Sequence, residues 1–468
     1  MIRLLLRSPR GTWLLAGAVW LAGCGALWSV LPYRPRAAWA TEEPAVVHGF
    51  IPGTAVVLTS TPWSPKIFDA QGPVIGPLLA RDAATGEVRE WFPDNERLTL
   101  VDPGVDGRHV LVGRVLGGRA RLFLLDAADG KVVAELPRGG PRAENPGDLP
   151  PDVDEQFAAF RPDGRRVVYA DRVGDERWLR VWDVETRQET AGLRDAAPPA
   201  AWSPDGRSLA YIPQGQKEAA VGVWELGTGL TRALGPSPSP DLRPEQLHFS
   251  SNGQTVVSVL RRIEEVLFRD PRDTHEVMAW DVGSGMKTLQ RQAHRAAFPA
   301  QTPWFAIENW DRPEGTCVHR YDYAGGALRD RFVLSEIMGP EWVGLSPDGG
   351  LVLRHDTIDN PIFEFLDLRL LQGALGTNVR PVVWETGSGR LRHVLPMAID
   401  PDVDSPAGHA WSADGTFLAI AGEDELTVWD IPPRRSLKWF MAGAALFALP
   451  PFVIARRRVR RLRREAAA

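Results

Sequence analysis

The chain has 468 residues, 44% of them hydrophobic and 24% charged, a balance typical of folded proteins that excludes an intrinsically disordered chain. Its formal net charge of −5 is unevenly divided, because residues 41–433 carry 39 basic and 58 acidic residues while both ends are basic. This excess of carboxylates argues against nucleic-acid binding by the central region, since phosphates would be repelled. The two cysteines, Cys24 and Cys317, are too few for a disulfide framework.

Residues 1–40 are predicted to form an N-terminal membrane anchor or signal segment. A stretch of 19 residues, 13–31, has no charge and follows three arginines, which places the start of the chain on the cytoplasmic side. Three interpretations stay open. The helix is retained; or Leu-Ala-Gly-Cys, which resembles a bacterial lipobox, makes Cys24 the lipidated residue; or Ala-Trp-Ala at 38–40 precedes a signal-peptidase cut.

Between the two ends, one motif recurs: a hydrophobic residue, a tryptophan and an acid. A tight turn of the Pro-Asp-Gly type precedes most copies, and a Thr-Gly or Ser-Gly turn follows several. A unit of this kind about every 40 to 60 residues is typical of a β-propeller. The motif tryptophans, which we expect to pack between neighbouring blades, are Trp182, Trp224, Trp280, Trp384 and Trp429.

The acids that end the third strand of each unit predict the number of blades. They indicate an all-β propeller of eight four-stranded blades within residues 41–433, with seven blades as the alternative. Three insertions, 141–155, 261–275 and 357–378, lengthen the gaps between units and are the expected contact loops for a partner. The eight acids are Asp82, Asp126, Asp183, Glu225, Asp281, Asp322, Glu385 and Asp430.

The last unit stops after its Trp-Asp strand and lacks the sequence for a fourth strand. A closed ring needs this blade completed, so we expect a strand from the other end of the domain to join it. Residues Glu43 to Val47 are the predicted clasp.

The C-terminal end predicts a second membrane helix over residues 434–456 and a basic cytoplasmic tail over 457–468. The stretch from Leu437 to Ala455 is apolar apart from Lys438, and seven arginines follow it by residue 464. Because positive flanks remain in the cytoplasm, this tail is expected inside. Flanking transmembrane helices would then place the propeller on the extracytoplasmic, periplasmic face of the cytoplasmic membrane.

The repeat resembles that of the WD40 family over nearly all of residues 45–432. In the best-matching segments, Ala201–Leu226 and His409–Ile431, a Trp-Ser-x-Asp-Gly turn leads to a strand that ends in tryptophan and an acid. The Gly-His dipeptide of the family is mostly missing, so these repeats are divergent. The resemblance implies a propeller that binds proteins as a non-catalytic scaffold, and the two apolar ends indicate a membrane-anchored protein of a bacterial type.

A second propeller family offers an alternative. Residues 80–86, followed by Trp91, look like the tryptophan-docking repeat of pyrroloquinoline-quinone-type propellers, which commonly have eight blades. Residues 124–131 repeat it in part. This resemblance implies a quinoprotein enzyme or an envelope assembly factor.

Catalytic motifs are missing from the sequence, which has no nucleophile elbow, metal helix, phosphate loop or Cys-x-x-Cys pair. We therefore predict no enzyme activity, no cofactor and no metal. Four histidines near predicted inner strands are expected to be ordinary strand residues: His48, His248, His294 and His409. The expected partners are the membrane, through both apolar segments, and a protein of unknown identity.

Overall fold

The computed structural model describes residues 8–30, 36–42, 45–62, 68–69, 72–73, 75–90, 98–116, 119–137, 157–174, 176–214, 221–235, 242–262, 274–299, 301–311, 315–335, 342–357, 379–388, 390–395, 408–422, 425–431 and 437–465. The chain divides into two compact units, one formed by Ala37–Asp430 and the other by its two ends. The three insertions lie mostly outside the described residues.

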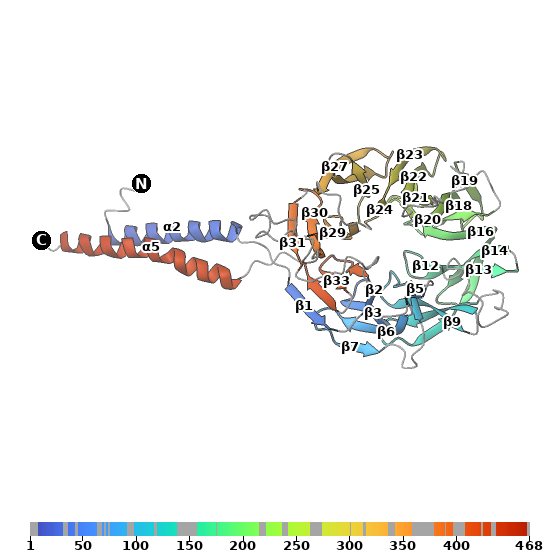
Figure 1. Ribbon diagram of the computed structural model, residues 1–468, viewed down its shortest axis with the longest axis horizontal. Coiled ribbons are helices and arrows are strands. Elements are labelled where there is room, and N and C mark those ends of the chain that lie inside the picture. Colours follow the sequence, from blue (N-terminus) through green and yellow to red (C-terminus); the bar gives the residue numbers. More distant parts are fainter. Residues whose placement is uncertain are drawn as a thin grey trace, which may run out of the picture. The chain divides into compact units, whose positions relative to one another are not determined.

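The larger unit is a ring of eight four-stranded antiparallel sheets, which confirms the prediction of eight blades and makes the seven-blade alternative wrong (Figure 1). Blade 1 contains β2 (Val46–Phe50), β3 (Val56–Pro62), β6 (Ile75–Asp82) and β7 (Val88–Glu90), with a small ribbon of β4 (Phe68–Asp69) and β5 (Gly72–Pro73). Blade 2 contains β8 (Leu98–Asp102), β9 (His109–Leu116), β10 (Arg119–Asp126) and β11 (Val132–Glu135). Blade 3 contains β12 (Ala158–Phe160), β13 (Arg166–Val173), β14 (Glu176–Asp183) and β15 (Gln188–Arg194).

Blades 4 to 7 repeat the same order of strands from the ring centre outward. Blade 4 contains β16 (Ala196–Trp202), β17 (Ser208–Pro213), β18 (Val221–Glu225) and β19 (Thr231–Leu234). Blade 5 contains β20 (Leu242–Phe249), β21 (Thr255–Arg262), β22 (Thr274–Asp281) and β23 (Lys287–Ala293). Blade 6 contains β24 (Arg295–Ala297), β25 (Trp304–Asp311), β26 (Gly315–Asp322) and β27 (Leu328–Ser335). Blade 7 contains β28 (Trp342–Leu345), β29 (Leu351–Thr357), β30 (Val379–Glu385) and β31 (Arg390–Val394).

Blade 8 is composite. Its inner three strands are β32 (His409–Trp411), β33 (Phe417–Ala421) and β34 (Leu426–Asp430), and its outer strand is β1 (Arg36–Thr41) from the start of the domain. The last blade is therefore completed by a borrowed strand. The predicted clasp at Glu43–Val47 is wrong, because Val46 begins the innermost strand of blade 1.

Burial differs from strand to strand in the way a packed blade requires. All eight acids that were expected to end a third strand do so. In β13 the side chains of residues 167–171 are all buried, since a middle strand packs against a neighbouring blade on both faces. In β15, at the rim, most side chains are exposed. The core is therefore divided into clusters that lie between consecutive blades.

The motif tryptophans occupy these clusters. Trp182 packs with residues of blades 2 and 3, Trp224 with blades 3 and 4, and Trp280 with blades 4 and 5. Trp384 is partly buried against residues of blades 6 and 7, and Trp429 in blade 8 is 5% exposed. The clusters keep these indoles apart, so they do not assemble into one binding platform.

The second unit contains two helices, α2 (Pro9–Val30) and α5 (Leu437–Glu465), which pack side by side (Figure 1). Trp13 lies 6.0 Å from Phe452 between ring centroids, and the Trp20 indole donates to the Ala444 carbonyl at 2.8 Å. Later residues of α2 thus meet earlier residues of α5, so the pair is antiparallel. Over their described residues, neither helix reaches the length and apolarity of a membrane span.

Candidate interaction surfaces

The hairpin turns between the first two strands share one polar design in four blades, blades 4, 5, 7 and 8. In blade 4 the Ser203 hydroxyl donates to the Asp205 carboxylate at 2.7 Å and accepts the Ser208 amide at 2.9 Å. The same Asp205 carboxylate accepts the Arg207 amide at 3.0 Å. These donors hold the pKa of Asp205 below its usual value, with the Ser203 hydroxyl contributing most. Turns at Ser250, Ser346 and Ser412 repeat this arrangement.

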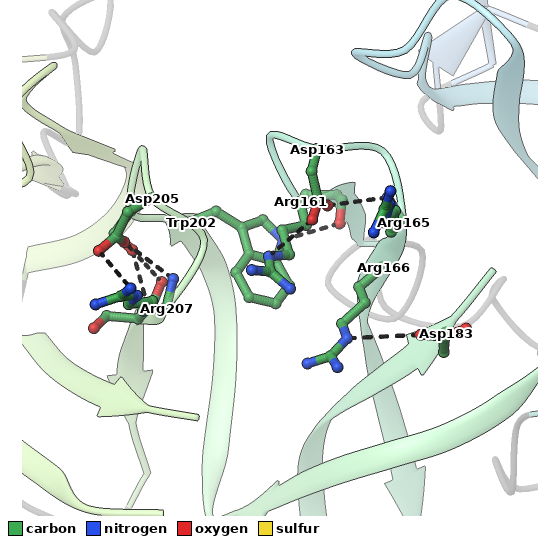
Figure 2. A network of polar contacts seen from close by, with 11 residues as sticks. Arg161, Asp163, Arg165, Arg166, Asp183, Trp202, Asp205 and Arg207 are labelled. Carbon is green, nitrogen blue, oxygen red and sulfur yellow. Dashed lines mark hydrogen bonds and ion pairs between the residues drawn. The ribbon is translucent and has the colours of Figure 1, made fainter. Parts of the chain in front are cut away.

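Neighbouring turns interlock through their glycines. Gly206 has a φ of +66°, and a Cβ atom there would lie 2.2 Å from the Arg161 Nε atom of blade 3. Arg161 also lies 3.6 Å from Asp163, measured between Nε and Oδ2, and the Trp202 indole donates to the Ala159 carbonyl at 3.2 Å (Figure 2). Glycine is therefore required at this turn both for its backbone conformation and for the close approach of blade 3.

Three exposed arginines occupy the same turn position in consecutive blades. Arg108, Arg165 and Arg207 each follow an Asp-Gly pair and are exposed, Arg207 with 83% of its side chain accessible. Their backbone amides donate to the turn aspartates at 2.9 to 3.0 Å, so these carboxylates are partly occupied inside the turn. This face of blades 2 to 4 thus presents guanidinium groups among carboxylates, a mixed-charge surface suited to a polar protein contact.

The innermost strands contain histidines that stay neutral at pH 7. His48 on β2 lies 2.9 Å from the Ser60 hydroxyl, and His248 on β20 stacks on Phe298 with 3.9 Å between centroids. Burial lowers the pKa of His48, His248 and His409 to about 4, and the nearby Arg295 contributes to the shift at His409. Within the described ranges, no group of three or more His, Cys, Asp or Glu residues could hold a metal ion.

Asp102, at the end of the inner strand of blade 2, links two blades. Its carboxylate accepts the Gly104 amide and, across the interface, the Phe160 amide of blade 3, both at 2.9 Å. Burial raises the pKa of Asp102 although these two donors oppose the shift. The buried carboxyl group therefore belongs to the framework of the ring.

Trp39 closes the ring, a role that the sequence reasoning missed. This residue lies on β1, and its indole donates to the carbonyls of Asp82 and Ala83 in blade 1 at 3.1 and 3.0 Å. A Cβ atom on Gly86, where φ is +76°, would lie 2.9 Å from the ring. The strand that completes blade 8 is thereby fastened to blade 1. A signal in the sequence was available, because residues 80–86 match a tryptophan-docking turn, and Trp39 docks against that turn.

The N-terminal sequence motifs occupy different places in the structure. The Ala-Trp-Ala motif at residues 38–40 forms the middle of β1, so a cut after Ala40 would sever the strand that completes blade 8. Cys24 lies in α2 and is 8% exposed. Trp91, the proposed docking residue of the quinone-type repeat, lies outside the described residues.

Arg354 on β29 is a buried cation in the interface between blades 6 and 7. Val352, two residues earlier on the same face, packs with Trp304 of blade 6. The Arg354 side chain is fully buried, and its Nε and both terminal nitrogens find no hydrogen-bond partner within the described part of the chain. A guanidinium buried without a partner would cost free energy.

The helix pair presents two kinds of surface. Its large apolar side chains are 40% or more exposed at Trp13, Leu14, Val19 and Leu21 of α2, and at Met441, Leu446, Phe447, Leu449, Val453 and Ile454 of α5. The antiparallel packing brings Arg10, at the start of α2, to the same end of the pair as the arginines that close α5. An apolar belt therefore leads to one strongly cationic end.

Comparisons with known proteins identify the fold. The chain is similar to the C-terminal WD40 domain of Sif2, with 12% identity and a TM-score of 0.50, over 86% of this chain and 99% of that domain. It is also similar to the Dos1 propeller, with 10% identity and a TM-score of 0.49, over 86% of this chain and 95% of that one. No protein-family model matches the chain. No curated protein matches it either. The fold is a WD40-like propeller of eight blades.

Proposed function

We propose that this protein is a membrane-anchored scaffold that binds another protein through the exposed turns and rim of its propeller. Propellers of the WD40 type present variable side chains on a rigid ring, a design suited to protein recognition. The mixed-charge turns of blades 2 to 4 offer such a surface. In this proposal the propeller has no catalytic role.

The observation that carries the membrane proposal is the helix pair with its exposed apolar belt and one cationic end. Ten large apolar side chains exposed on two helices would be unfavourable in water and favourable in lipid. In the sequence, the uncharged stretch that begins at Trp13 runs on to Leu31. Basic residues at the start of α2 and the end of α5 both assign the same end to the cytoplasm. The propeller then lies on the extracytoplasmic face.

We propose that the mature protein keeps α2. Closure of the ring through β1 supports it against a cut after Ala40. Mass spectrometry of the mature protein distinguishes the three forms: an intact start, an acylated Cys24, or a chain that begins at Thr41. A start at Thr41 would contradict both the retained helix and the closed ring.

Sidedness is tested with single reporter cysteines at two exposed arginines. In Arg207→Cys the thiol lies on a propeller turn, and in Arg464→Cys it lies at the end of α5. We expect an impermeant maleimide to label position 207 in spheroplasts and position 464 only after permeabilisation. Labelling of position 464 alone in sealed spheroplasts would refute the topology.

The scaffold role is tested by crosslinking in intact cells followed by purification of the full chain. We expect an extracytoplasmic protein to be captured, and its yield to fall when Arg108, Arg165 and Arg207 are all changed to Ser. The matched control changes three exposed arginines elsewhere on the propeller, Arg187, Arg291 and Arg329, to Ser. Equal loss in both variants would show that general charge, and not the turn surface, governs capture.

A further inference from the structure

The end of α5 contains a hollow whose lining combines cations with apolar side chains. Its residues, named the arginine hollow here, are Ile454, Arg457, Arg458, Arg461 and Leu462. Their spacing of i, i+3, i+4, i+7 and i+8 places all five on one face of the helix. The hollow follows directly on the exposed apolar side chains Val453 and Ile454.

This face carries more positive charge than the acids in the sequence of its own unit can offset. Arg457 and Arg461 are four residues apart on one helix face, where like charges repel. Residues 431–468 contain a single acid, Glu465, and residues 1–36 contain none. A single carboxylate cannot neutralise all three of Arg457, Arg458 and Arg461. An external anion would relieve the repulsion.

We propose that the arginine hollow binds the phosphate of an anionic phospholipid. The inference rests on the proposed membrane anchoring and names a ligand for it. Guanidinium groups bind phosphate oxygens through paired hydrogen bonds, and three of them on one face favour a headgroup that carries net negative charge. Ile454 and Leu462 provide apolar contacts for the adjoining glycerol and acyl carbons.

The apolar half of the lining favours a lipid over a nucleic acid. A nucleic acid would meet the arginines but would leave Ile454 and Leu462 in contact with sugar and phosphate. A phospholipid places its phosphate and its hydrocarbon next to each other in the order in which α5 presents arginines and apolar side chains. The hollow matches that order.

The test compares two triple variants of the full chain with the same loss of charge. The hollow variant is Arg457→Gln, Arg458→Gln, Arg461→Gln. The control variant is Arg456→Gln, Arg460→Gln, Arg463→Gln, whose side chains are exposed on the other side of α5. Binding of fluorescent phosphatidylglycerol and phosphatidylcholine is measured in zwitterionic detergent micelles.

We expect the intact chain to prefer phosphatidylglycerol, and the hollow variant to lose about tenfold or more in affinity for it, while the control variant loses about threefold or less. Equal losses in the two variants, or no preference in the intact chain, would overturn the proposal. So would a hollow variant that loses binding to a single-stranded oligonucleotide but not to the lipid.

Membrane integration is measured separately, as resistance of the intact chain to alkaline carbonate extraction. Extraction of the intact chain from membranes would refute the anchoring on which the inference rests. Firm integration together with no lipid preference would refute the arginine hollow alone.

Discussion

The interface between blades 4 and 5 and the closure between blades 8 and 1 join neighbouring sheets with different side chains. The first buries large residues of a continuous stretch of chain, with Trp280 and Leu234 fully inaccessible. The second buries four alanines beside residues such as Phe50 and Val428, and Trp39 packs against it while only partly buried. The closure therefore gains less from apolar burial than the interior interface does.

This difference makes the closure a weaker joint than the interface between blades 4 and 5. A strand from the start of the domain must find β34 at its end, so its pairing carries the largest loop-closure cost. The two indole hydrogen bonds of Trp39 to blade 1 compensate in part. We expect local opening of the propeller to begin between blades 8 and 1.

The largest expected effect lies in the interior interface. Trp280→Ala leaves a cavity between blades 4 and 5 and should lower the free energy of unfolding by about 3 to 5 kcal/mol. Denaturant unfolding of the purified full chain measures it. Trp384→Ala, at a partly buried indole, is the matched comparison and should lose less. Equal losses would contradict the deeper burial of Trp280 compared with Trp384.

At the closure, Trp39→Ala removes packing and two hydrogen bonds and should lower the free energy of unfolding by about 2 to 3 kcal/mol. Trp39→Phe keeps most of the packing and should lose about 1 kcal/mol. Faster amide exchange confined to blades 8 and 1 is the expected signature. Destabilisation spread evenly around the ring would show that Trp39 does not act at the joint.

Acid should destabilise the ring through its buried histidines. His248 titrates near pH 6.5 when unfolded, but burial lowers its pKa to about 4 in the folded chain. Its stabilising contribution is therefore complete above about pH 6.5 and is lost as the pH falls toward 4, by about 3 kcal/mol. His248→Phe keeps the stack on Phe298 and should flatten the pH dependence of the unfolding midpoint in that window. An unchanged slope would contradict the assignment.

The interface between blades 6 and 7 differs from the other two because it buries a cation, Arg354. Arg354→Met removes a buried guanidinium that has no partner among the described residues and should stabilise the chain by about 1 to 3 kcal/mol. The midpoint of thermal unfolding measures the change. A loss of several kcal/mol instead would mean that the cation is paired in solution.

The smallest expected effect concerns the outer turns. In blade 5 the Asp281 carboxylate accepts the Ser284 amide and hydroxyl, both at 2.7 Å, and these donors lower its pKa, the hydroxyl most. Asp281→Ala should slightly lower the midpoint of denaturant unfolding. In blade 4, Glu225 accepts only the Thr228 hydroxyl at this turn, and Glu225→Ala should lose less. The reverse order would contradict the turn assignment.

Most of the propeller could be predicted because its units are local. A turn, a strand and an acid lie within a few residues of each other, and the acid caps the turn that follows it, as Asp82 does for Thr85 at 2.8 Å. The repeat therefore locates each third strand. Those same contacts explain why the blade count could be read from the acids.

The closure could not be predicted in the same way, because strand propensity does not specify a partner far away in sequence. Glu43–Val47 has the composition of a strand, but its last two residues begin β2, the inner strand of blade 1, which leads into the turn at Pro52-Gly53. Ala38, Trp39 and Ala40 resembled a cleavage motif, and only the fold places them beside β34. The neutral histidines and the buried Arg354 likewise depend on burial between blades.

Hydrogen–deuterium exchange on the intact chain tests the closure most directly. We expect the amides of residues 36–41 and 426–430 to be protected together, and Trp39→Ala to accelerate exchange in both segments and in 82–86 while blades 3 to 5 keep their protection. Residues 36–41 exchanging at the rate of an unstructured peptide, with 426–430 fully protected, would contradict a ring closed by its N-terminal strand.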